Sequence, residues 1–260
     1  QFDDNVSLAE NIQKNILQRG SILYSEVEFL LRQELREISV YNIIIEAIAL
    51  GNTKLNDIHQ KTQVEKTKLS AYLKNLMDLR VVSREFSVED GVKEKANIQR
   101  GLYRVTDNFF RFWYAFVFPN VSELEAGDCK GVYEYAVKPR LEEYTSYIFE
   151  DVCKEYLRMK NRREELPFHF TRIGRWWNKT DELDVVAVDY ERKNYILGEC
   201  KFKKSTFGIS DFKKMKEKFV PGITDGNIYY WVFSKGGFTK EVVEAKKEYM
   251  LELVELKEIL

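Results

Sequence analysis

The sequence predicts an α+β protein whose first half is mainly helical and whose second half combines strands with helices. Two observations carry this division. Residues 7–79 contain helix-start signals and apolar residues at helical spacing, whereas residues 183–201 contain two apolar, strand-like runs around a polar segment. Separate helical and strand-rich regions are typical of the α+β class, and a length of 260 residues favours two domains over one.

Helix-start signals open the chain. Residues 7–10 and residues 25–28 each place a glutamate three positions after a serine, which predicts two capping boxes, and the first helix should end near Gly20. Three further helices with short connections follow, the first of them stopped by Gly51. Their predicted ranges are 41–50, 55–60 and 66–79. Three closely spaced helices of this kind are typical of a helix-turn-helix.

A β-ribbon is expected next, because residues 81–88 and residues 101–105 have the pattern of strands on either side of a polar segment. A helical triad followed by a ribbon resembles a winged-helix domain, which implies that the third helix and the ribbon contact DNA. The candidate contacts to phosphates or base edges are Lys66, Lys68, Ser70 and Lys74 in the helix and Arg84, Lys93, Lys95 and Arg100 in the ribbon. The alternative is a module of the same fold that packs against protein.

The segment 103–119 is too rich in aromatic side chains to be a surface linker. Large aromatic side chains contribute most when they are buried. The segment is therefore expected to pack in a core or at a seam between domains, and not to line a ligand cage.

A polar, turn-like segment separates two apolar runs in the second half, which predicts a β-hairpin. The two runs cover residues 183–188 and 195–201. With the hairpin loop centred between residues 191 and 192, Asp184 lies opposite Glu199, and their Cβ atoms are about 5 Å apart. Because side chains alternate along a strand, Lys201 projects from the same face as Glu199, and Cys200 points to the other face.

Two adjacent carboxylates repel each other, so Asp184 and Glu199 are a poor choice for a purely structural pair. A divalent cation removes this conflict, and Mg²⁺ typically takes one or two carboxylates together with water and phosphate oxygens. Lys201 would then polarise an attacking water or stabilise charge on a phosphoryl group. The alternative is a salt-bridged surface face of an amphipathic hairpin.

Residues 144–157 have apolar side chains at helical spacing and contribute Glu150. A helix with a carboxylate, a strand with aspartate and a strand with Glu-x-Lys resembles the PD-(D/E)xK nuclease-like superfamily, although Leu183 replaces the nominal proline. The resemblance implies an α/β restriction-endonuclease-like domain with a mixed central sheet, and a site that binds Mg²⁺ or Mn²⁺ through its three carboxylates. The implied catalytic residues are Glu150, Asp184, Glu199 and Lys201. Residues 228–233 predict a further buried strand, and residues 238–260 a helix followed by a short strand.

The formal net charge of −1 argues against binding nucleic acid through bulk charge, so local clusters matter more. Seven lysines lie between residues 199 and 218, and Lys203 and Lys204 are candidate contacts to nucleic acid. A second basic cluster covers residues 158–163. Trp176, Trp177 and Lys179 form a candidate rim, with packing as the alternative for at least one tryptophan. The alternative for both clusters is an ordinary solvated face.

Composition narrows the class of protein. A hydrophobic content of 44% is enough for a substantial core. Three cysteines without Cys-x-x-Cys spacing and two histidines indicate neither a structural zinc site nor a disulfide framework. No apolar run reaches the roughly 20 residues that span a bilayer, and no signal peptide is visible, so the expected location is the cytoplasm without a membrane partner.

The order of these parts resembles the C-terminal portion of archaeal-type ATPases, in which an AAA-like P-loop core precedes a winged helix and a nuclease-related domain. The resemblance rests on residues 23–31, 103–113, 173–177 and 198–201. It implies four parts: the helical lid end of an absent ATPase core (1–38), a winged helix (39–105), an aromatic connector (106–135) and a nuclease-like domain (136–260). The chain lacks a Gly-x-x-x-x-Gly-Lys-[Ser/Thr] loop and begins with Gln1, so we expect a fragment, with ATP bound only by the absent core in cis.

Two functions follow from the resemblance. The first is a DNA-binding region with metal-dependent phosphodiester hydrolysis. The second is a non-catalytic DNA-binding or regulatory module in which a nuclease-like scaffold serves the ATPase, because a fold does not establish an activity. The sequence leaves open DNA versus RNA, the strand structure of the substrate and the oligomeric state.

Overall fold

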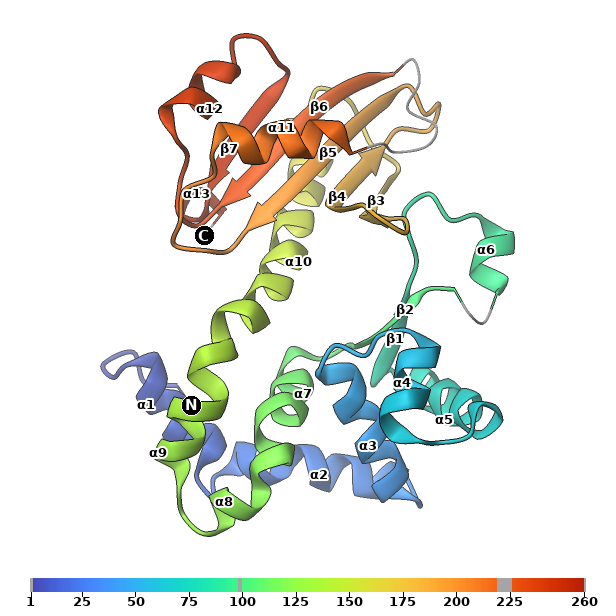
Figure 1. Cartoon of the computed structure of the whole chain (residues 1–260), viewed down its shortest axis with the longest axis vertical. Coiled ribbons are helices and arrows are strands. Elements are labelled where there is room, and N and C mark those ends of the chain that lie inside the picture. Colours follow the sequence, from blue (N-terminus) through green and yellow to red (C-terminus); the bar gives the residue numbers. More distant parts are fainter. Residues whose placement is uncertain (1, 98–99, 219–225, 260) are drawn as a thin grey trace. The chain divides into compact units, whose positions relative to one another are not determined.

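The computed structural model describes residues 2–97, 100–218 and 226–259, which form two compact units (Figure 1). Unit 1 consists of Gln1–Phe86 and Val92–Arg140, and unit 2 consists of Ser87–Gly91 and Leu141–Leu260. Across the described ranges, no helix combines the length and the apolar character needed to cross a membrane. The chain is an α+β protein, as predicted: helices and a small hairpin come first, and a mixed sheet with helices follows.

The first helix of unit 1, α1 (Leu8–Ile12), begins with the predicted capping box. The Glu10 amide donates to Ser7 Oγ over 3.2 Å, and the Ser7 amide donates to Glu10 Oε2 over 2.8 Å. The helix continues as a π-helical turn over Gln13–Leu17, and Gly20 follows with a positive φ of 87°. The prediction for this helix is therefore confirmed.

The second predicted capping box is wrong. Helix α2 (Ile22–Glu34) starts earlier than expected, because Ser21 Oγ accepts a hydrogen bond from the Tyr24 amide and caps it. Ser25 consequently lies within the helix, and Glu28 forms an ion pair with Arg32 one turn later.

The predicted helical triad and ribbon are present in unit 1. The helices are α3 (Ile38–Ala49), α4 (Leu55–Thr62) and α5 (Lys66–Asp78), and the strands are β1 (Val82–Glu85) and β2 (Leu102–Val105). The strands pair antiparallel, with Val82 opposite Val105. The segment between them contains a short helix, α6 (Val92–Ala96), where only a polar loop was expected. Fully buried leucines and isoleucines, among them Ile44, Ile58 and Leu73, fix the triad around one core.

The aromatic segment lies in the core of unit 1. It forms α7 (Asn108–Phe112), a π-helical turn (Trp113–Val117) and a 3₁₀ turn (Phe118–Asn120). Trp113 and Tyr114 are nearly or fully buried, and each still satisfies its polar atom. Trp113 Nε1 donates to the Tyr24 carbonyl over 2.8 Å, and the Tyr114 hydroxyl donates to Asn42 Oδ1 over 2.7 Å. The core packing predicted for this segment is confirmed.

Unit 1 ends in a series of short helices. They are α8 (Val121–Glu125), α9 (Cys129–Val132), a π-helical turn (Tyr133–Val137) and a 3₁₀ turn (Lys138–Arg140).

Unit 2 is built on a five-stranded mixed sheet in the order β3-β4-β5-β6-β7, flanked by helices. The two pairs β3-β4 and β4-β5 are antiparallel, whereas β5-β6 and β6-β7 are parallel, so the predicted mixed sheet is confirmed. The strands are β3 (Arg172–Trp177), β4 (Glu182–Val188), β5 (Asn194–Lys201), β6 (Asn227–Ser234) and β7 (Leu251–Glu255). The helices are α10 (Leu141–Arg162), α11 (Ile209–Glu217), α12 (Lys240–Ala245) and α13 (Leu256–Ile259).

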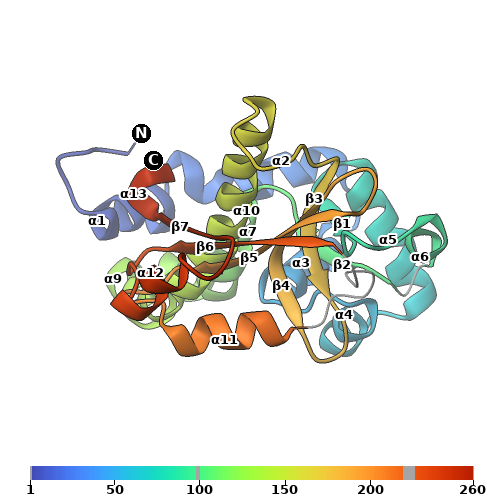
Figure 2. The ribbon, with the colours of Figure 1, turned by 90° about the horizontal axis from the view of Figure 1, so that it is seen from above.

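Helices cover both faces of this sheet, as Figure 2 shows for α10 and α11. Apolar residues of α11 and α12, including Phe212, Met215 and Val242, pack against Val186 and Leu197 on one face. On the other face Phe149, Cys153 and Leu157 of α10 pack against Val185, Ala187 and Ile196. The alternation of residues between the two clusters is the period of two that a strand buried on both faces requires.

Candidate functional site

The central hairpin of unit 2 has the predicted register. The β4-β5 ladder pairs Val185 with Gly198 and ends at Val188 opposite Tyr195. Continuing it by one residue places Asp184 beside Glu199. Glu199 shares a sheet face with Leu197, which belongs to the cluster under α11. The side chain of Lys201, two residues further along β5, lies on this face as well.

Asp184 is held by the backbone of the neighbouring strand. The amide of Cys200 donates to Asp184 Oδ2 over 2.8 Å, at the point where the β4-β5 ladder stops. The carboxylate thus accepts a hydrogen bond from an N–H group that lies beyond the end of the β4-β5 ladder at Gly198. This bond satisfies both the carboxylate and the amide in a largely buried place. Asp184 is therefore oriented before any ligand arrives.

The two carboxylates have unusual electrostatics. Burial, and then the charge of nearby Asp184, raise the pKa of Glu199 to about 7, and the neighbouring Lys218 opposes this rise. Burial also raises the pKa of Asp184, while the hydrogen bond from the Cys200 amide and the charge of Arg175 act in the opposite direction. Both carboxylates are thus destabilised in their charged forms, as expected for like charges held together away from water.

Helix α11 and the residue that follows it supply a counter-ion to each charge of the Glu-x-Lys pair. Lys218 Nζ donates to Glu199 Oε2 over 2.7 Å, and Lys201 Nζ donates to Asp211 Oδ2 over 3.0 Å. Asp211 is itself fixed by the Gly208 amide, which donates to the same Oδ2 atom over 3.0 Å. That hydrogen bond and Lys201 hold the pKa of Asp211 below its usual value.

Glu150 does not join the other two carboxylates. It lies on α10, which covers the face opposite to α11, and only 7% of its surface is exposed. Its Oε2 atom is 3.4 Å from Arg175 Nε, and Arg175 also reaches Glu182 Oε2 over 3.2 Å. In the part of the chain that the structure describes, no group of three or more His, Cys, Asp and Glu side chains could hold a metal ion.

The pair Asp184 and Glu199 fits a divalent cation that takes few ligands from the protein. Asp184 and Glu199 offer hard oxygen donors, and their mutual repulsion would be relieved by a positive ion. Mg²⁺ commonly binds through one or two carboxylates and completes its coordination with water and phosphate oxygens, whereas a cage made only of protein ligands is typical of Ca²⁺. The donor set is therefore compatible with Mg²⁺ or Mn²⁺ whose remaining ligands are water and phosphate oxygens.

Most of the predicted nucleic-acid contacts lie on exposed surface. These are Lys66, Lys68 and Lys74 on α5, Lys93 and Lys95 on α6, and Lys203 and Lys204 in the loop after β5. Ser70 is half-buried, and its hydroxyl donates to the Lys66 carbonyl over 3.0 Å. The exposed lysines remain candidates, and their contact with DNA stays a prediction.

Arg84 is half-buried and makes contacts within the ribbon, and its contact with DNA stays a prediction. Its Nε donates to the Arg100 carbonyl over 2.7 Å, and its guanidinium lies 4.7 Å from the centre of the Phe86 ring. These contacts hold the ribbon together and leave the guanidinium engaged. For Trp176 the packing alternative is confirmed, because this side chain is 3% exposed and packs in the core together with residues of α11. Trp177 is half-buried and Lys179 is exposed.

Four charged residues around the site were not assigned to it from the sequence. They are Arg175, Glu182, Asp211 and Lys218. The only local signal is the position of Asp211, three residues after a glycine at the start of a Lys-rich helix. The pairing of Lys218 with Glu199 depends on how α11 packs on the sheet, and the sequence pattern does not contain that information.

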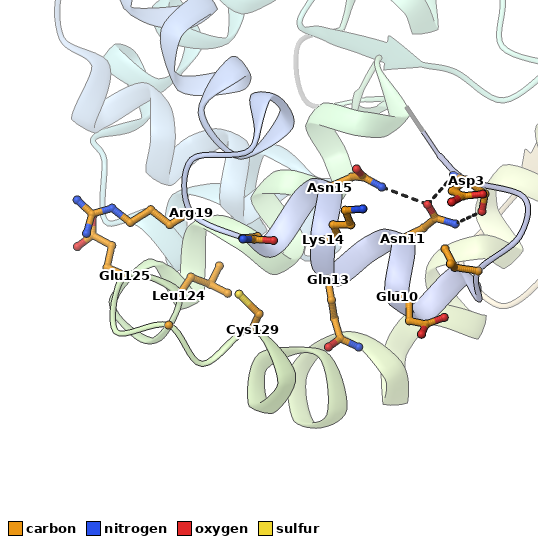
Figure 3. Close-up of a pocket in the computed structure, with 13 residues that line it drawn as sticks. Asp3, Glu10, Asn11, Gln13, Lys14, Asn15, Arg19, Leu124, Glu125 and Cys129 are labelled. Carbon is orange, nitrogen blue, oxygen red and sulfur yellow. Dashed lines mark hydrogen bonds between the residues drawn. The ribbon is translucent and has the colours of Figure 1, made fainter.

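Unit 1 contains a separate pocket of about 740 Å³ (Figure 3). It is lined by residues near the start of the chain and by Leu124, Glu125, Gly127 and Cys129. Asn11 braces one wall, because its amide group bonds both the amide and the carbonyl of Asp3 over 2.8 Å. Both signs of charge line the pocket, with Asp3 and Glu10 against Lys14 and Arg19, so it favours no single class of ligand.

Comparison with known proteins gives two findings. Residues 113–217 match the family DUF234, described as archaea bacterial proteins of unknown function. The chain is also 34% identical over 237 residues to an uncharacterized protein of Methanocaldococcus jannaschii, a match that covers 88% of this chain and 52% of that protein. The family match includes Asp184, Glu199 and Lys201 and ends one residue before Lys218. The chain thus spans about half the length of its archaeal relative, and its middle is similar to a family of archaeal and bacterial proteins.

Proposed function

We propose that unit 2 is a nuclease-like domain of the PD-(D/E)xK type, which hydrolyses phosphodiester bonds in DNA with Mg²⁺ or Mn²⁺. The observation that carries the proposal is the pair Asp184 and Glu199 at the end of the β4-β5 ladder, with Lys201 on the same face as Glu199. The sheet holds two carboxylates with raised pKa values next to each other, which destabilises the folded chain. Such perturbed carboxylates are typical of functional sites. The antiparallel hairpin followed by parallel strands and preceded by α10 agrees with the same resemblance.

Each residue has a distinct role in this proposal. The Cys200 amide fixes the Asp184 carboxylate, so its free oxygen needs little reorganisation to bind a cation. Glu199 supplies the second carboxylate. Lys201, oriented by Asp211, stabilises negative charge on the phosphate or orients the attacking water. A divalent metal, when bound, would neutralise charge on the phosphate and lower the pKa of a bound water.

Glu150 acts indirectly in this scheme. Its carboxylate pairs with Arg175, whose charge in turn lowers the pKa of Asp184. Glu150 is thus a positioning residue, and Asp184 and Glu199 remain the residues that would bind the metal.

The proposal extends to unit 1 and to a longer protein. A helical triad and a two-stranded hairpin that present exposed lysines on α5 and α6 support a winged helix that binds DNA phosphates. The archaeal relative is about twice as long as the aligned region, which is compatible with an ATPase core elsewhere in the full protein. ATP binding belongs to that core in this scheme.

A second candidate function is a non-catalytic DNA-binding or regulatory module. The specific observation in its favour is that internal partners already neutralise the site: Lys218 pairs with Glu199, Asp211 pairs with Lys201, and Arg175 pairs with Glu150. A scaffold that has lost its metal could be held together in this way.

One experiment separates the two functions. The purified chain is incubated with single-stranded, duplex and branched DNA in Mg²⁺ or Mn²⁺, beside Glu199→Gln and Lys201→Met. Glu191→Gln is the matched control, because Glu191 lies in the exposed loop of the same hairpin, where it forms an ion pair with Lys193. Cleavage that is lost in the two site variants and kept in the control supports the nuclease. Equal cleavage by all four proteins rules out the assigned site, and metal-independent DNA binding without cleavage favours the regulatory module.

A further inference from the structure

Lys218 forms an ion pair with Glu199, one of the two carboxylates proposed to bind a metal. We infer that its ammonium group is a built-in competitor of the divalent metal, and that displacement of Lys218 from Glu199 sets the metal affinity of the site. This inference rests on the proposed function of the Asp184–Glu199 pair. It assigns a new role to a residue that lies just outside the segment matched by the family.

The geometry of the ion pair supports competition. Lys218 Nζ is 2.7 Å from Glu199 Oε2, and the two side chains are only 20% and 28% exposed. The same ammonium lies close enough to Asp184 to lower the pKa of that carboxyl. One positive group therefore serves both candidate metal ligands, which is the position that a divalent ion would need.

The charges at the site leave room for a stronger cation. Asp184, Glu199 and Asp211 bring three carboxylates to this face of the sheet, against the two ammonium groups of Lys201 and Lys218. Asp211 already engages Lys201 over 3.0 Å, and Arg175, which also acts on Asp184, is itself engaged by Glu150 and Glu182. Lys218 is the group whose ammonium pairs directly with Glu199. A single positive charge against two negative charges is an incomplete match, and a divalent ion would complete it.

Lys218 can leave without disrupting its helix. It follows the last residue of α11, and its backbone amide donates to the Met215 carbonyl over 3.3 Å independently of the side chain. A lysine side chain has four flexible methylene groups and a strongly hydrated ammonium, so rotation into solvent costs little. An arginine-carboxylate pair with two parallel hydrogen bonds would be harder to displace.

The test is metal binding, measured by isothermal titration calorimetry of Mn²⁺ and of Mg²⁺ added to the metal-free chain at pH 8. The variants are Lys218→Met and Lys218→Arg, and Lys213→Met is the control, since Lys213 is an exposed lysine of the same helix. Lys218→Met should bind Mn²⁺ about tenfold more tightly than the original chain, which corresponds to about 1.4 kcal/mol. Lys218→Arg should bind as weakly as the original chain or more weakly, and Lys213→Met should be unchanged. Circular dichroism without metal verifies that each variant is folded.

The outcomes separate this inference from the function on which it rests. If the original chain binds Mn²⁺ and Lys218→Met binds it with the same or lower affinity, competition by Lys218 is wrong while the metal site stands. If Mn²⁺ binds neither protein at millimolar concentration, the metal site itself is wrong. A tenfold gain that appears equally in Lys213→Met would show a general charge effect and overturn the specific role of Lys218.

Discussion

Unit 1 and unit 2 bury polar side chains of different kinds. In unit 1 the buried polar groups are neutral and hydrogen-bonded, such as Asn11, the Trp113 indole and the Tyr114 hydroxyl. Within the described ranges, the charged side chains that are less than 9% exposed all belong to unit 2. They are Glu150, Lys154 and Arg175. The half-buried pair Asp184 and Glu199 adds two carboxylates with raised pKa values.

This difference indicates that the interior of unit 2 has more than a packing role. A neutral group needs one hydrogen bond to compensate its burial, whereas a charge costs several kcal/mol and needs a partner in good geometry. Apolar residues could fill the same space at less cost. The concentration of buried charge in unit 2 is therefore better explained by a site than by stability, and measurements of stability can test this.

The largest effect is expected at the buried ion pair of unit 2. Arg175→Met would leave the Glu150 carboxylate buried without its arginine, so the free energy of unfolding should fall by about 3–5 kcal/mol. Urea denaturation followed by circular dichroism measures this change. The control is Arg158→Met, because the side chains of Arg158 and its partner Glu155 are 42% and 58% exposed, and this change should cost less than about 0.5 kcal/mol. Equal effects of the two substitutions would remove the contrast between the units.

The next effect has the opposite sign. Between the ordinary carboxyl value of 4.5 and about 7, the folded protein keeps a proton on Glu199 that the unfolded chain has lost, so stability falls as pH rises through this window. Glutamine cannot ionise. In the presence of a chelator, Glu199→Gln should therefore be more stable than the original chain at pH 8, by about 3 kcal/mol.

The pH dependence of that difference is its check. The gain of Glu199→Gln should shrink as pH falls from 8 to 4.5, because Glu199 becomes protonated in the folded chain and then partly protonated in the unfolded chain as well. Denaturation curves at four or five pH values give the difference. A gain that is absent at pH 8, or that is the same at pH 4.5, would contradict the electrostatic account of Asp184, Glu199 and Lys218.

A smaller and pH-independent effect is expected in unit 1. Tyr114→Phe removes the hydrogen bond to Asn42 and leaves the ring in place, so the free energy of unfolding should fall by about 1 kcal/mol. Burial raises the pKa of Tyr114, so its hydroxyl stays neutral across the range from 4.5 to 8. Tyr135→Phe is the control, since Tyr135 is 88% exposed. A clear pH dependence for Tyr114→Phe would mean that unit 1 also stores charge.

The sequence predicted those parts of unit 2 that depend on local periodicity. The β4-β5 register followed from the alternation of side chains and from the loop centre, because the loop of a hairpin fixes which residues of its two strands lie opposite each other. Strand β6 and the helix and strand after it were recognisable for the same reason. The α1 capping box was also predictable, since both of its hydrogen bonds join residues three apart.

Other features depend on packing between distant segments and could not be predicted in this way. Strand β3 was missed because the register shifts between Gly174 and Trp176, so the bulge interrupts the alternation there. The helix of Glu150 was predicted, but the Arg175 that pairs with it lies on that missed strand. Lys218 reaches Glu199 only because α11 crosses the sheet, and no spacing along the chain encodes this contact.

The smallest effect on stability should come with a clear effect on DNA binding. Lys66 and Lys68 are exposed on α5, so replacing both with methionine should change the free energy of unfolding by less than about 0.5 kcal/mol. If both contact phosphates, the slope of log affinity for duplex DNA against log salt concentration should decrease in magnitude by about 2, because each contact contributes about 0.9.

The matched control replaces Lys14 and Lys130, which are exposed elsewhere in unit 1, and should leave the slope unchanged. Fluorescence anisotropy between 50 and 200 mM salt, a range over which two phosphate contacts change affinity by about tenfold, measures both slopes. An equal decrease in the two double variants would indicate nonspecific charge, and no decrease in either would favour the protein-packing alternative for the helical triad. A decrease confined to α5 would show that the exposed charges of this helix bind phosphate, whereas the described charges below 9% exposure all lie in unit 2.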